Sequence, residues 1–538
     1  MPEPQVSPQS LTTRIYRFGG QRSRWRHPNP RLEAEVAVKI RNLNLSEFGT
    51  ADRRKGYTRY NSSQITGSEA VTGLLEQQFI TPDAKHEIFV TPTKIYADDG
   101  STRKDITGSV SLSGDANDLT TFEFLLDTVV ATNAKDPPWI WVGNFATPTT
   151  AAALTVTAAN MTRVEDFAVI ENLLIALGTT EGGDIHPTRV RWSDINEALL
   201  TPNIGSWPTE NRHEIDEGTE KIVGGVGNFG RLLIFKRDGM YPGFFNFQTG
   251  FVEFQQEEPK LGFRPVSRTS IVKRPEFVWI IAEDGAYVVD PSLNVSKVTD
   301  DIQDEWESLN QGRLEYAVSS VLVNQRQVKT LLSSENNTSG HDLVLLWDWE
   351  SGNLMIDELK DNMSYISNRK NSDVKEVTWY GGTTVGYVFD GTGTTDDDTV
   401  GIDWEYFSAP NDLGMPNVTK IIKNVTVWYK DVEAGAQNIV IEVVRDQGVR
   451  SSRTKTMTFG TDLSYDAGIL YDSGISWPGG ANKKARFFVN RNAENISIRL
   501  TGDEDVNLHG YSVEFIPTEP IAETRTGEVQ QRSYSLTN

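Results

Sequence analysis

The sequence predicts an all-β chain, with a β-propeller of about six blades followed by a C-terminal antiparallel β-sandwich. A short β-prone run, a turn built on Gly or Asp and another such run recur along the chain, and Asp-Gly marks the turn in 95–100, 231–241, 277–289 and 385–391. Asp-Gly between apolar runs favours a hairpin, because Gly, and Asp at lower cost than most residues, reach positive φ. Related phrases recur at intervals of roughly 40 to 65 residues, with one wider gap of about 85. This spacing suits four-stranded blades that carry insertions, with a degenerate blade in the wide gap.

The pattern changes after residue 410. Apolar and polar residues alternate cleanly in the segments 420–429, 439–444, 486–489, 496–500 and 508–515. These segments span about 100 residues, the size and rhythm of a separate antiparallel sandwich. We therefore expect an extended basic arm at 1–32, the propeller with insertions at 33–410, the sandwich at 411–517 and a mobile tail at 518–538.

The arm is expected to be extended because prolines recur in it and block regular structure. They are Pro2, Pro4, Pro8, Pro28 and Pro30. Further along, 299–309 is the one segment that predicts a helix, with Thr299 or Asp300 as its cap and Ile302, Trp306 and Leu309 on one face. We expect this helix to pack between two blades.

Composition excludes several kinds of protein. The 538 residues are 38% hydrophobic, enough to bury a core, and they contain no cysteine. Disulfides, cysteine-bound zinc, iron–sulfur clusters and thiol nucleophiles are thereby excluded. No apolar run approaches the roughly 18 residues that a spanning helix needs, and the N-terminus lacks the layout of a signal peptide. We expect a soluble chain without a membrane-spanning segment.

The charge is strongly acidic but unevenly distributed. The net charge is −22, from 74 acidic and 52 basic residues, which argues against a general grip on nucleic acid. The segment 1–60 is nevertheless basic. It predicts an arm that docks on an acidic neighbour or on nucleic acid, although solvated surface charges explain the pattern equally well. The residues expected to dock on another subunit or an adaptor are Arg22, Arg24, Trp25, Arg26, Arg53, Arg54 and Lys55.

No motif indicates catalysis. The six histidines are scattered without metal-ligand spacing, and the Gly-rich run 224–230 leads into a strand, so it favours a tight turn between blades over a phosphate loop. The acidic turn 390–398 does not match a calcium-binding loop and predicts a solvated hairpin tip. Catalytic, cofactor-binding and metal-binding residues are therefore expected to be absent.

Two pairs of tryptophans could serve a sugar or the core. Trp139 and Trp141, and likewise Trp347 and Trp349, lie two residues apart and would share one face of a strand. Each pair could form an aromatic platform for a sugar. Packing between adjacent sheets is the interpretation that we favour.

The order of several motifs resembles a known family. Asn42-Leu-Asn-Leu followed by Arg53-Arg-Lys-Gly-Tyr57 resembles the start of phage structural proteins, and Trp192-Ser-Asp194, 224–241 and 277–302 follow. Together, over about residues 33–516, they resemble the β-propeller tail nozzle of short-tailed bacteriophages, also described as a packaged-DNA stabilisation or head-completion protein.

The resemblance implies a non-enzymatic virion protein of the tail, assembled in the cytoplasm of the bacterial host. It would form a ring, usually a homohexamer, below the portal–adaptor complex. The lumen would continue the DNA channel, retain packaged DNA and release it on ejection, and the outer surface would hold tail fibres or spikes. Acidic walls fit this role, because they let DNA pass without sequence-specific binding.

Two other functions stay open at this stage. A carbohydrate-binding or depolymerising tail or baseplate protein would use the propeller, the sandwich and the tryptophan pairs. An intracellular propeller scaffold would be a monomer that binds protein partners. The sequence leaves ring order, blade count and the residues of the lumen undetermined.

Overall fold

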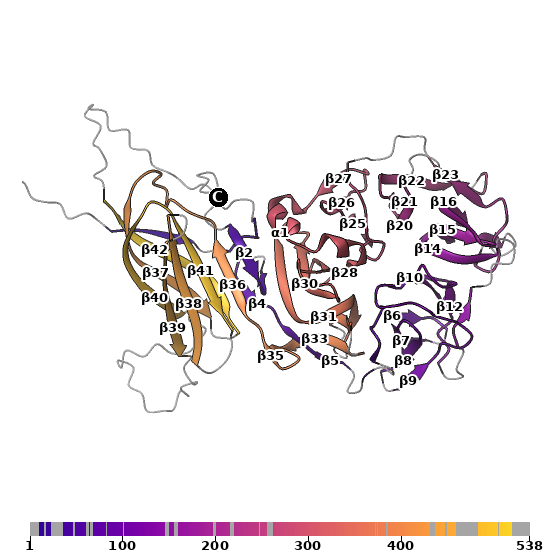
Figure 1. Cartoon of the computed structure of the whole chain (residues 1–538), viewed down its shortest axis with the longest axis horizontal. Helices are drawn as coiled ribbons and strands as arrows, with labels where there is room; N and C mark the ends of the chain where they lie inside the picture. The colour runs from indigo at the N-terminus through magenta and orange to yellow at the C-terminus, as the bar shows by residue number, and fades with distance from the viewer. Residues whose placement is uncertain are drawn as a thin grey trace, which may run out of the picture.

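The chain consists almost entirely of β-strands, as the sequence predicts. The structure, a computed structural model, shows two bodies along the longest axis, a ring of small sheets and a pair of larger sheets beside it (Figure 1). It describes residues 10–518 except for 16–17, 23–35, 47–48, 61–63, 65–67, 82, 101, 146–149, 155–159, 197–200, 216–219, 247, 255–261, 372, 374, 384–385, 431–435, 447–448, 459–482 and 504. The predicted tail lies outside the described residues except for Thr518.

Five antiparallel sheets of four strands each follow one another around the ring (Figure 1). Four of them join consecutive strands, and the third passes over a small hairpin, β17 (Asp194–Asn196) and β18 (Thr201–Asn203). The strands are β6 (Gly73–Phe79), β7 (Ala84–Val90), β8 (Ile95–Asp98), β9 (Arg103–Asp105); β10 (Thr121–Leu125), β11 (Thr128–Thr132), β12 (Trp139–Trp141), β13 (Ala152–Ala153); β14 (Met161–Ile170), β15 (Leu173–Glu181), β16 (Asp184–Trp192), β19 (Arg212–Glu214); β20 (Ile222–Asn228), β21 (Arg231–Lys236), β22 (Gly239–Asn246), β23 (Phe251–Phe254); β24 (Val272–Arg274), β25 (Phe277–Ala282), β26 (Gly285–Val289) and β27 (Val295–Lys297).

Two further four-stranded units belong to one larger sheet and share a strand. The 17-residue strand β31 (Leu354–Lys370) pairs with β30 through its first part and with β32 through its second part. The sixth unit is β28 (Val318–Leu322), β29 (Gln327–Leu332), β30 (His341–Asp348) and β31, and the seventh is β31, β32 (Glu376–Gly382), β33 (Val388–Thr394) and β5 (Gly56–Arg59).

The beginning of the chain completes the seventh unit and so closes the ring. Arg59 of β5 lies opposite Phe389 of β33 in the antiparallel register. On the other side of the same unit, Ser364 of β31 donates a hydrogen bond to the carbonyl oxygen of Val71, 2.7 Å away, just ahead of β6. The last unit therefore touches the first.

The hydrophobic cores of the ring lie between neighbouring sheets. One cluster joins β21 to β25 through Leu233, Phe235, Val278 and Ile280, all of them fully buried. Strands in such a position are covered on both faces, which explains why the sequence shows continuous apolar runs there. Three of the four Asp-Gly turns fall between these runs and join consecutive strands, as predicted. The fourth prediction is wrong, because Asp390-Gly391 lies inside strand β33.

The first tryptophan pair is part of this packing. Trp139 and Trp141 are each 1% exposed, in the core between the first and second sheets. Trp347 stacks on Trp279 with ring centroids 5.2 Å apart, and Trp349 is partly buried against the same core. The core interpretation is confirmed for Trp139 and Trp141.

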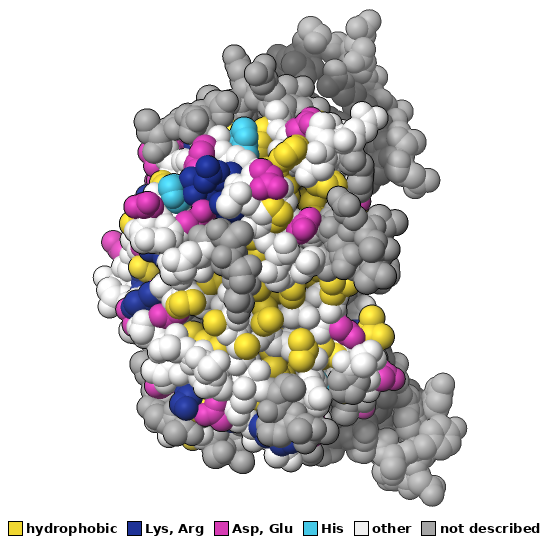
Figure 2. All heavy atoms as spheres, turned by 90° about the vertical axis from the view of Figure 1, so that its right-hand side faces the viewer, with side chains coloured by type: hydrophobic (Ala, Val, Ile, Leu, Met, Phe, Trp, Pro, Cys, Tyr) yellow, Lys and Arg dark blue, Asp and Glu magenta, His cyan; other side chains and the backbone are white. Residues whose placement is uncertain are grey.

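The outer strands of the ring are more exposed. Both residues of β13 are exposed, as expected for a weakly packed outer strand, and Ile185 of β16 is 71% exposed. On the right-hand face of Figure 1, hydrophobic side chains spread across the middle and charged side chains gather on either side (Figure 2).

The second body consists of two sheets that share one hydrophobic core, with Val425, Val427, Ile441 and Leu500 among its buried members. One sheet contains β3 (Leu43–Leu45), β4 (Ala51–Arg53), β42 (Asn507–Pro517), β37 (Lys420–Lys430), β40 (Lys483–Ala493) and β1 (Leu11–Ile15). The other layer is formed by β2 (Ala37–Arg41), β36 (Trp404–Ser408), β41 (Ile496–Gly502), β38 (Ala436–Arg445) and β39 (Val449–Thr458). These strands continue the sheet of the sixth and seventh units, because β2 pairs in parallel with β31, with Arg41 opposite Ile356, so the two bodies share one 12-stranded sheet.

This pairing differs from the boundaries expected at residues 33 and 410. Strands β2 to β4 and β36 belong to the sheets of the second body, and β1, inside the predicted arm, pairs with β42. The alternation of residues 34–45 identifies a strand but not its partner, because β2 pairs with β36 and β4 with β42, both far later in the chain.

Two local predictions are corrected by the structure. The helical segment exists as a 3-10 turn (Thr299–Ile302) followed by α1 (Gln303–Glu307), but Thr299 does not cap it. Its Oγ1 accepts a hydrogen bond from the amide of Ala286, 3.0 Å away. The Gly-rich run is mainly strand β20, not a turn. A Cβ on Gly227 would lie 1.8 Å from the carbonyl oxygen of Val169, so glycine allows β20 to approach β14.

Among the described residues, no helix combines the length and the apolar character that crossing a bilayer requires.

Candidate functional site

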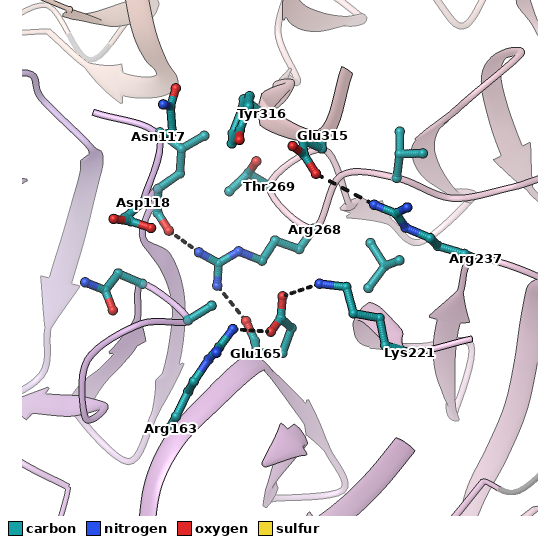
Figure 3. A pocket seen from close by; sticks show the side chains of 15 residues that line it. Asn117, Asp118, Arg163, Glu165, Lys221, Arg237, Arg268, Thr269, Glu315 and Tyr316 are labelled. Atoms are coloured by element: carbon teal, nitrogen blue, oxygen red, sulfur yellow. Dashed lines mark hydrogen bonds and ion pairs between the residues drawn. The ribbon is translucent and has the colours of Figure 1, made fainter. Parts of the chain in front are cut away.

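A polar cavity of about 180 Å³ lies within the ring, and we call it the axial pocket (Figure 3). Its fifteen lining residues come mostly from the starts of the first strands of successive units. Arg163 and Glu165 lie in β14, Lys221 precedes β20, Arg268 precedes β24 and Glu315 precedes β28. Segments that are distant in sequence therefore deliver side chains to one place.

Arg268 lies at the centre of the axial pocket (Figure 3). Its guanidinium donates hydrogen bonds to the carbonyl oxygen of Glu165, 2.5 Å away, and to that of Leu119. Burial lowers the pKa of Arg268, although Glu165 and Asp166 oppose the shift. Arginine stays protonated in proteins, so Arg268 is a fixed positive charge held by the backbone of two other units.

A buried carboxyl group lies beside this arginine. Asp166 is 4% exposed, and its Oδ2 accepts a hydrogen bond from the amide of Gly225, 3.1 Å away. Burial raises the pKa of Asp166 to about 7, even though the charge of Arg268 lowers it. A Cβ on Gly224 would lie 2.7 Å from the same oxygen, so the glycines of β20 make room for the carboxyl group.

Ion pairs line the wall of the axial pocket. Glu165 lies 3.2 Å from Arg163 and 3.5 Å from Lys221, and Arg237 lies 3.7 Å from Glu315. Four basic side chains face three acidic ones, a local excess of one positive charge in a chain of net charge −22. They are Arg163, Lys221, Arg237 and Arg268 against Asp118, Glu165 and Glu315.

One acid of this set has a partner outside the axial pocket, and other side chains cross the ring nearby. Asp118 lies 3.1 Å from Lys135, so part of its charge is already balanced. Tyr365 of β31 donates a hydrogen bond to the carbonyl oxygen of Thr120, 2.8 Å away, which joins the seventh unit to the second. With Arg268, this contact connects units that are not neighbours in the ring.

A second cavity, of about 400 Å³, adjoins the axial pocket. Both cavities are lined by Arg237, Val266 and Glu315. The second also takes in Glu283 and the turn that contains Gln311. Ions and polar groups are the ligands that such charged walls can hold.

The docking residues expected from the sequence do not come together at one surface. Arg22 is half-exposed and lies 3.3 Å from Asp301, while Arg24, Trp25 and Arg26 lie outside the described residues. Lys55 is half-exposed and its Nζ lies 2.7 Å from Asp505.

Arg53 and Arg54 are buried, which corrects their assignment as docking residues. Arg54 is 4% exposed and donates hydrogen bonds to both carboxylate oxygens of Asp397, which is fully buried, at 2.5 and 2.7 Å. Burial lowers the pKa of Arg54, but the hydrogen bond with Asp397 and the charges of Asp357 and Asp397 together outweigh it, and the pKa is raised. Arg53 is 3% exposed and lies 3.7 Å from Asp505. The acidic partners follow much later in the chain, so the local basic run could not reveal them.

The acidic turn is also drawn into ion pairs. Asp390 lies beside Arg369, and Asp397 beside Arg54, so two of its carboxylates are buried rather than solvated as expected. Within the described part of the chain, no group of three or more His, Cys, Asp or Glu residues is placed to hold a metal ion.

Sequence reasoning missed the axial pocket entirely. Arg163, Lys221, Arg237 and Arg268 come from separate segments of the chain, and although Arg237 falls in the hairpin phrase 231–241, nothing in that phrase indicates a shared site. The one shared signal is that Arg163, Lys221 and Arg268 lie at or just before the start of a first strand. That signal becomes visible only when the units are known.

Comparisons with known proteins give at most a weak likeness in fold. No family model and no curated protein matches the chain. A solved structure of BBS1N in complex with ARL6DN is similar at a TM-score of 0.38 and 12% identity, over 63% of this chain and 96% of that one. The extracellular domain of BT4673 from B. thetaiotaomicron is similar at a TM-score of 0.41 and 8% identity, over 80% of this chain and 58% of that one.

Proposed function

We propose that this chain is a non-enzymatic subunit of a tail nozzle of a short-tailed bacteriophage, built as a seven-bladed propeller joined to a β-sandwich. The observation that carries the proposal is the position of the Arg53-Arg-Lys-Gly-Tyr57 motif, one of the motifs whose order gives the resemblance. The motif runs from the end of β4 in the paired sheets to the start of β5 in the ring. The motif therefore connects the two bodies, and this position supports the proposal.

The seven blades follow from treating each four-stranded unit as one blade. The sequence predicts about six, because the seventh borrows half of β31 and takes its last strand from residues 56–59. Closure by a strand from the other end of the chain completes the last blade, so the ring of blades has no gap, while the outer strands of the blades remain as short edges.

In the proposed ring, usually of six subunits, DNA passes through the central lumen that the subunits enclose and not through the inside of each propeller. Arg268 and Tyr365 cross the inside of the propeller, so a duplex has no path there. The net charge of −22 suits a wall that DNA passes without binding. The portal–adaptor complex and tail fibres or spikes are the partners of such a ring, and the virion tail is its location.

The proposal is tested by the mass and shape of the purified protein. Light scattering and negative-stain imaging, alone and with a portal–adaptor complex, should show a ring, or ring formation on the adaptor. A persistent monomer of 60.0 kDa that ignores the adaptor would overturn the proposal. Particles assembled without the chain should package DNA and then leak it, and full DNA retention in them would also contradict it.

The packing of the tryptophan pairs weakens one argument for the alternative carbohydrate-binding function. Trp139 and Trp141 are buried between sheets, and Trp347 is stacked on Trp279, so neither pair is a free aromatic platform. Glycan arrays and an assay of reducing-sugar release remain the direct tests of that function.

A further inference from the structure

We infer that the axial pocket binds a small multivalent oxyanion, of the class of inorganic phosphate or citrate. This inference does not depend on the proposed ring of subunits. It begins with charge: four basic side chains from four segments meet at one cavity of an acidic chain. Bringing like charges together is unfavourable unless anions compensate them. The acids that line the pocket offset three of these charges, and Asp166, beside Arg268, offsets part of the fourth.

The contacts inside the pocket leave hydrogen-bonding capacity. The distances from Lys221 to Glu165 and from Arg237 to Glu315 are 3.5 and 3.7 Å. Charge-assisted hydrogen bonds are typically about 2.7–2.9 Å, so these two cations are near their acids without a tight bond. The Nε of Arg237 is buried and has no hydrogen-bond partner. A buried donor without a partner calls for a ligand, a water or an ion.

The floor of the pocket is preorganised for an anion. Two backbone carbonyl oxygens hold the guanidinium of Arg268, and they come from different units of the ring. The charge therefore needs no reordering when a ligand arrives, which lowers the cost of binding. Arginine has five N–H donors, and its planar fork suits the oxygens of phosphate and carboxylate.

An acidic side chain already marks where an oxyanion would go. The carboxylate of Glu165 lies between Arg163 and Lys221 (Figure 3). An incoming oxyanion competes with it for the same cations. The volume of about 180 Å³ admits a small ion, and the adjoining cavity gives room for a ligand with several carboxylates.

The test is calorimetric titration of the full chain with inorganic phosphate and with citrate at low salt. Lys221→Ala and Arg237→Ala should each weaken binding about tenfold, since each removes one charged hydrogen bond. The matched control is Lys94→Ala, because Lys94 is similarly exposed and pairs with Asp105 away from the pocket. The control should bind as the native chain does.

A second variant is expected to change the affinity in the opposite direction, which distinguishes a specific site from general electrostatic attraction. Glu165→Gln removes the competing carboxylate and should tighten binding several-fold, a change opposite in direction to that of Lys221→Ala. Thermal unfolding of each variant confirms that it folds. Absence of binding by the native chain, an equal loss in Lys94→Ala, or unchanged or weaker binding by Glu165→Gln would each overturn the inference.

Discussion

The axial pocket and the joint between the two bodies both gather charges from distant segments, but they treat those charges differently. In the pocket, Lys221 and Arg237 are partly exposed and stand 3.5 and 3.7 Å from their acids. At the joint, Arg54 and Asp397 are buried and form two direct hydrogen bonds. Burial makes the loss of one partner of the joint pair costly, whereas exposure leaves the pocket pairs able to exchange partners.

The joint is tightened by further hydrogen bonds to Arg54. Its guanidinium also donates to Oδ1 of Asn42, 2.8 Å away, and to the carbonyl oxygen of Glu358, 2.7 Å away. Asn42 in turn donates from Nδ2 to the carbonyl oxygen of Asp403 at 2.6 Å. One side chain therefore connects the entry to β3, the middle of β31 and the approach to β36.

Breaking the joint should produce the largest effect. Arg54→Met leaves the buried carboxylate of Asp397 without its partner and should lower the free energy of unfolding by about 3–5 kcal/mol. Chemical denaturation measures the loss. Adding Asp397→Leu should restore much of it, because an apolar pair tolerates burial. Arg326→Met is the control, since Arg326 pairs with exposed Glu350 at the surface. A similar loss in the control would contradict the comparison.

The second largest effect is expected at the contact between β14 and β20. Gly227→Ala places a Cβ against the carbonyl oxygen of Val169, so the strands must separate, at a cost of about 1–3 kcal/mol. Gly401→Ala is matched to it, because nothing lies within 4 Å of a Cβ added there. Thermal unfolding should distinguish the two variants, and equal melting temperatures would contradict the close approach.

The region of the axial pocket also contains a group, Asp166, whose protonation makes the stability of the fold depend on pH. The pKa of Asp166 is about 7 in the fold and 3.8 as its ordinary value, so the folded chain holds this proton more tightly. The stabilisation is complete below the ordinary value and is lost as pH rises toward 7, by roughly 2 kcal/mol between pH 5 and pH 7.

Asp166→Asn should remove this dependence. The amide keeps an oxygen acceptor for Gly225 and does not ionise, so the stability of the variant relative to the native chain should rise from pH 5 to pH 7. Denaturation at both values measures the difference. A difference that stays constant with pH would show that Asp166 is ionised throughout.

The smallest effect is expected in the wall of the axial pocket. Lys221 is half-exposed, and its pair with Glu165 is at 3.5 Å, so Lys221→Ala should change the free energy of unfolding by less than about 1 kcal/mol. The same denaturation series provides the measurement. A loss as large as that of Arg54→Met would place Lys221 among the structural residues.

Local sequence predicted the strands and hairpins well, and it failed wherever the partner was remote. The turn at Arg237 and Asp238 joins β21 to β22 because Gly239 follows it, a signal contained within a few residues. The partners of β2 and β5 and the acids beside Arg53 and Arg54 lie beyond the range of any local pattern. The axial pocket was hidden for the same reason, since its cations come from segments that are distant in the sequence.

The closure of the ring by β5 also determines how late in translation the ring can be completed. Arg59 must wait for Phe389, its partner in the register, which is made much later. Ribosomes add about 5–20 residues per second, so the wait between these two positions is roughly 15–65 s. During that interval a basic segment leaves the ribosome before its acidic partners exist. The newborn chain therefore needs either protection of its first strands or a folding order in which the middle of the ring forms before its ends.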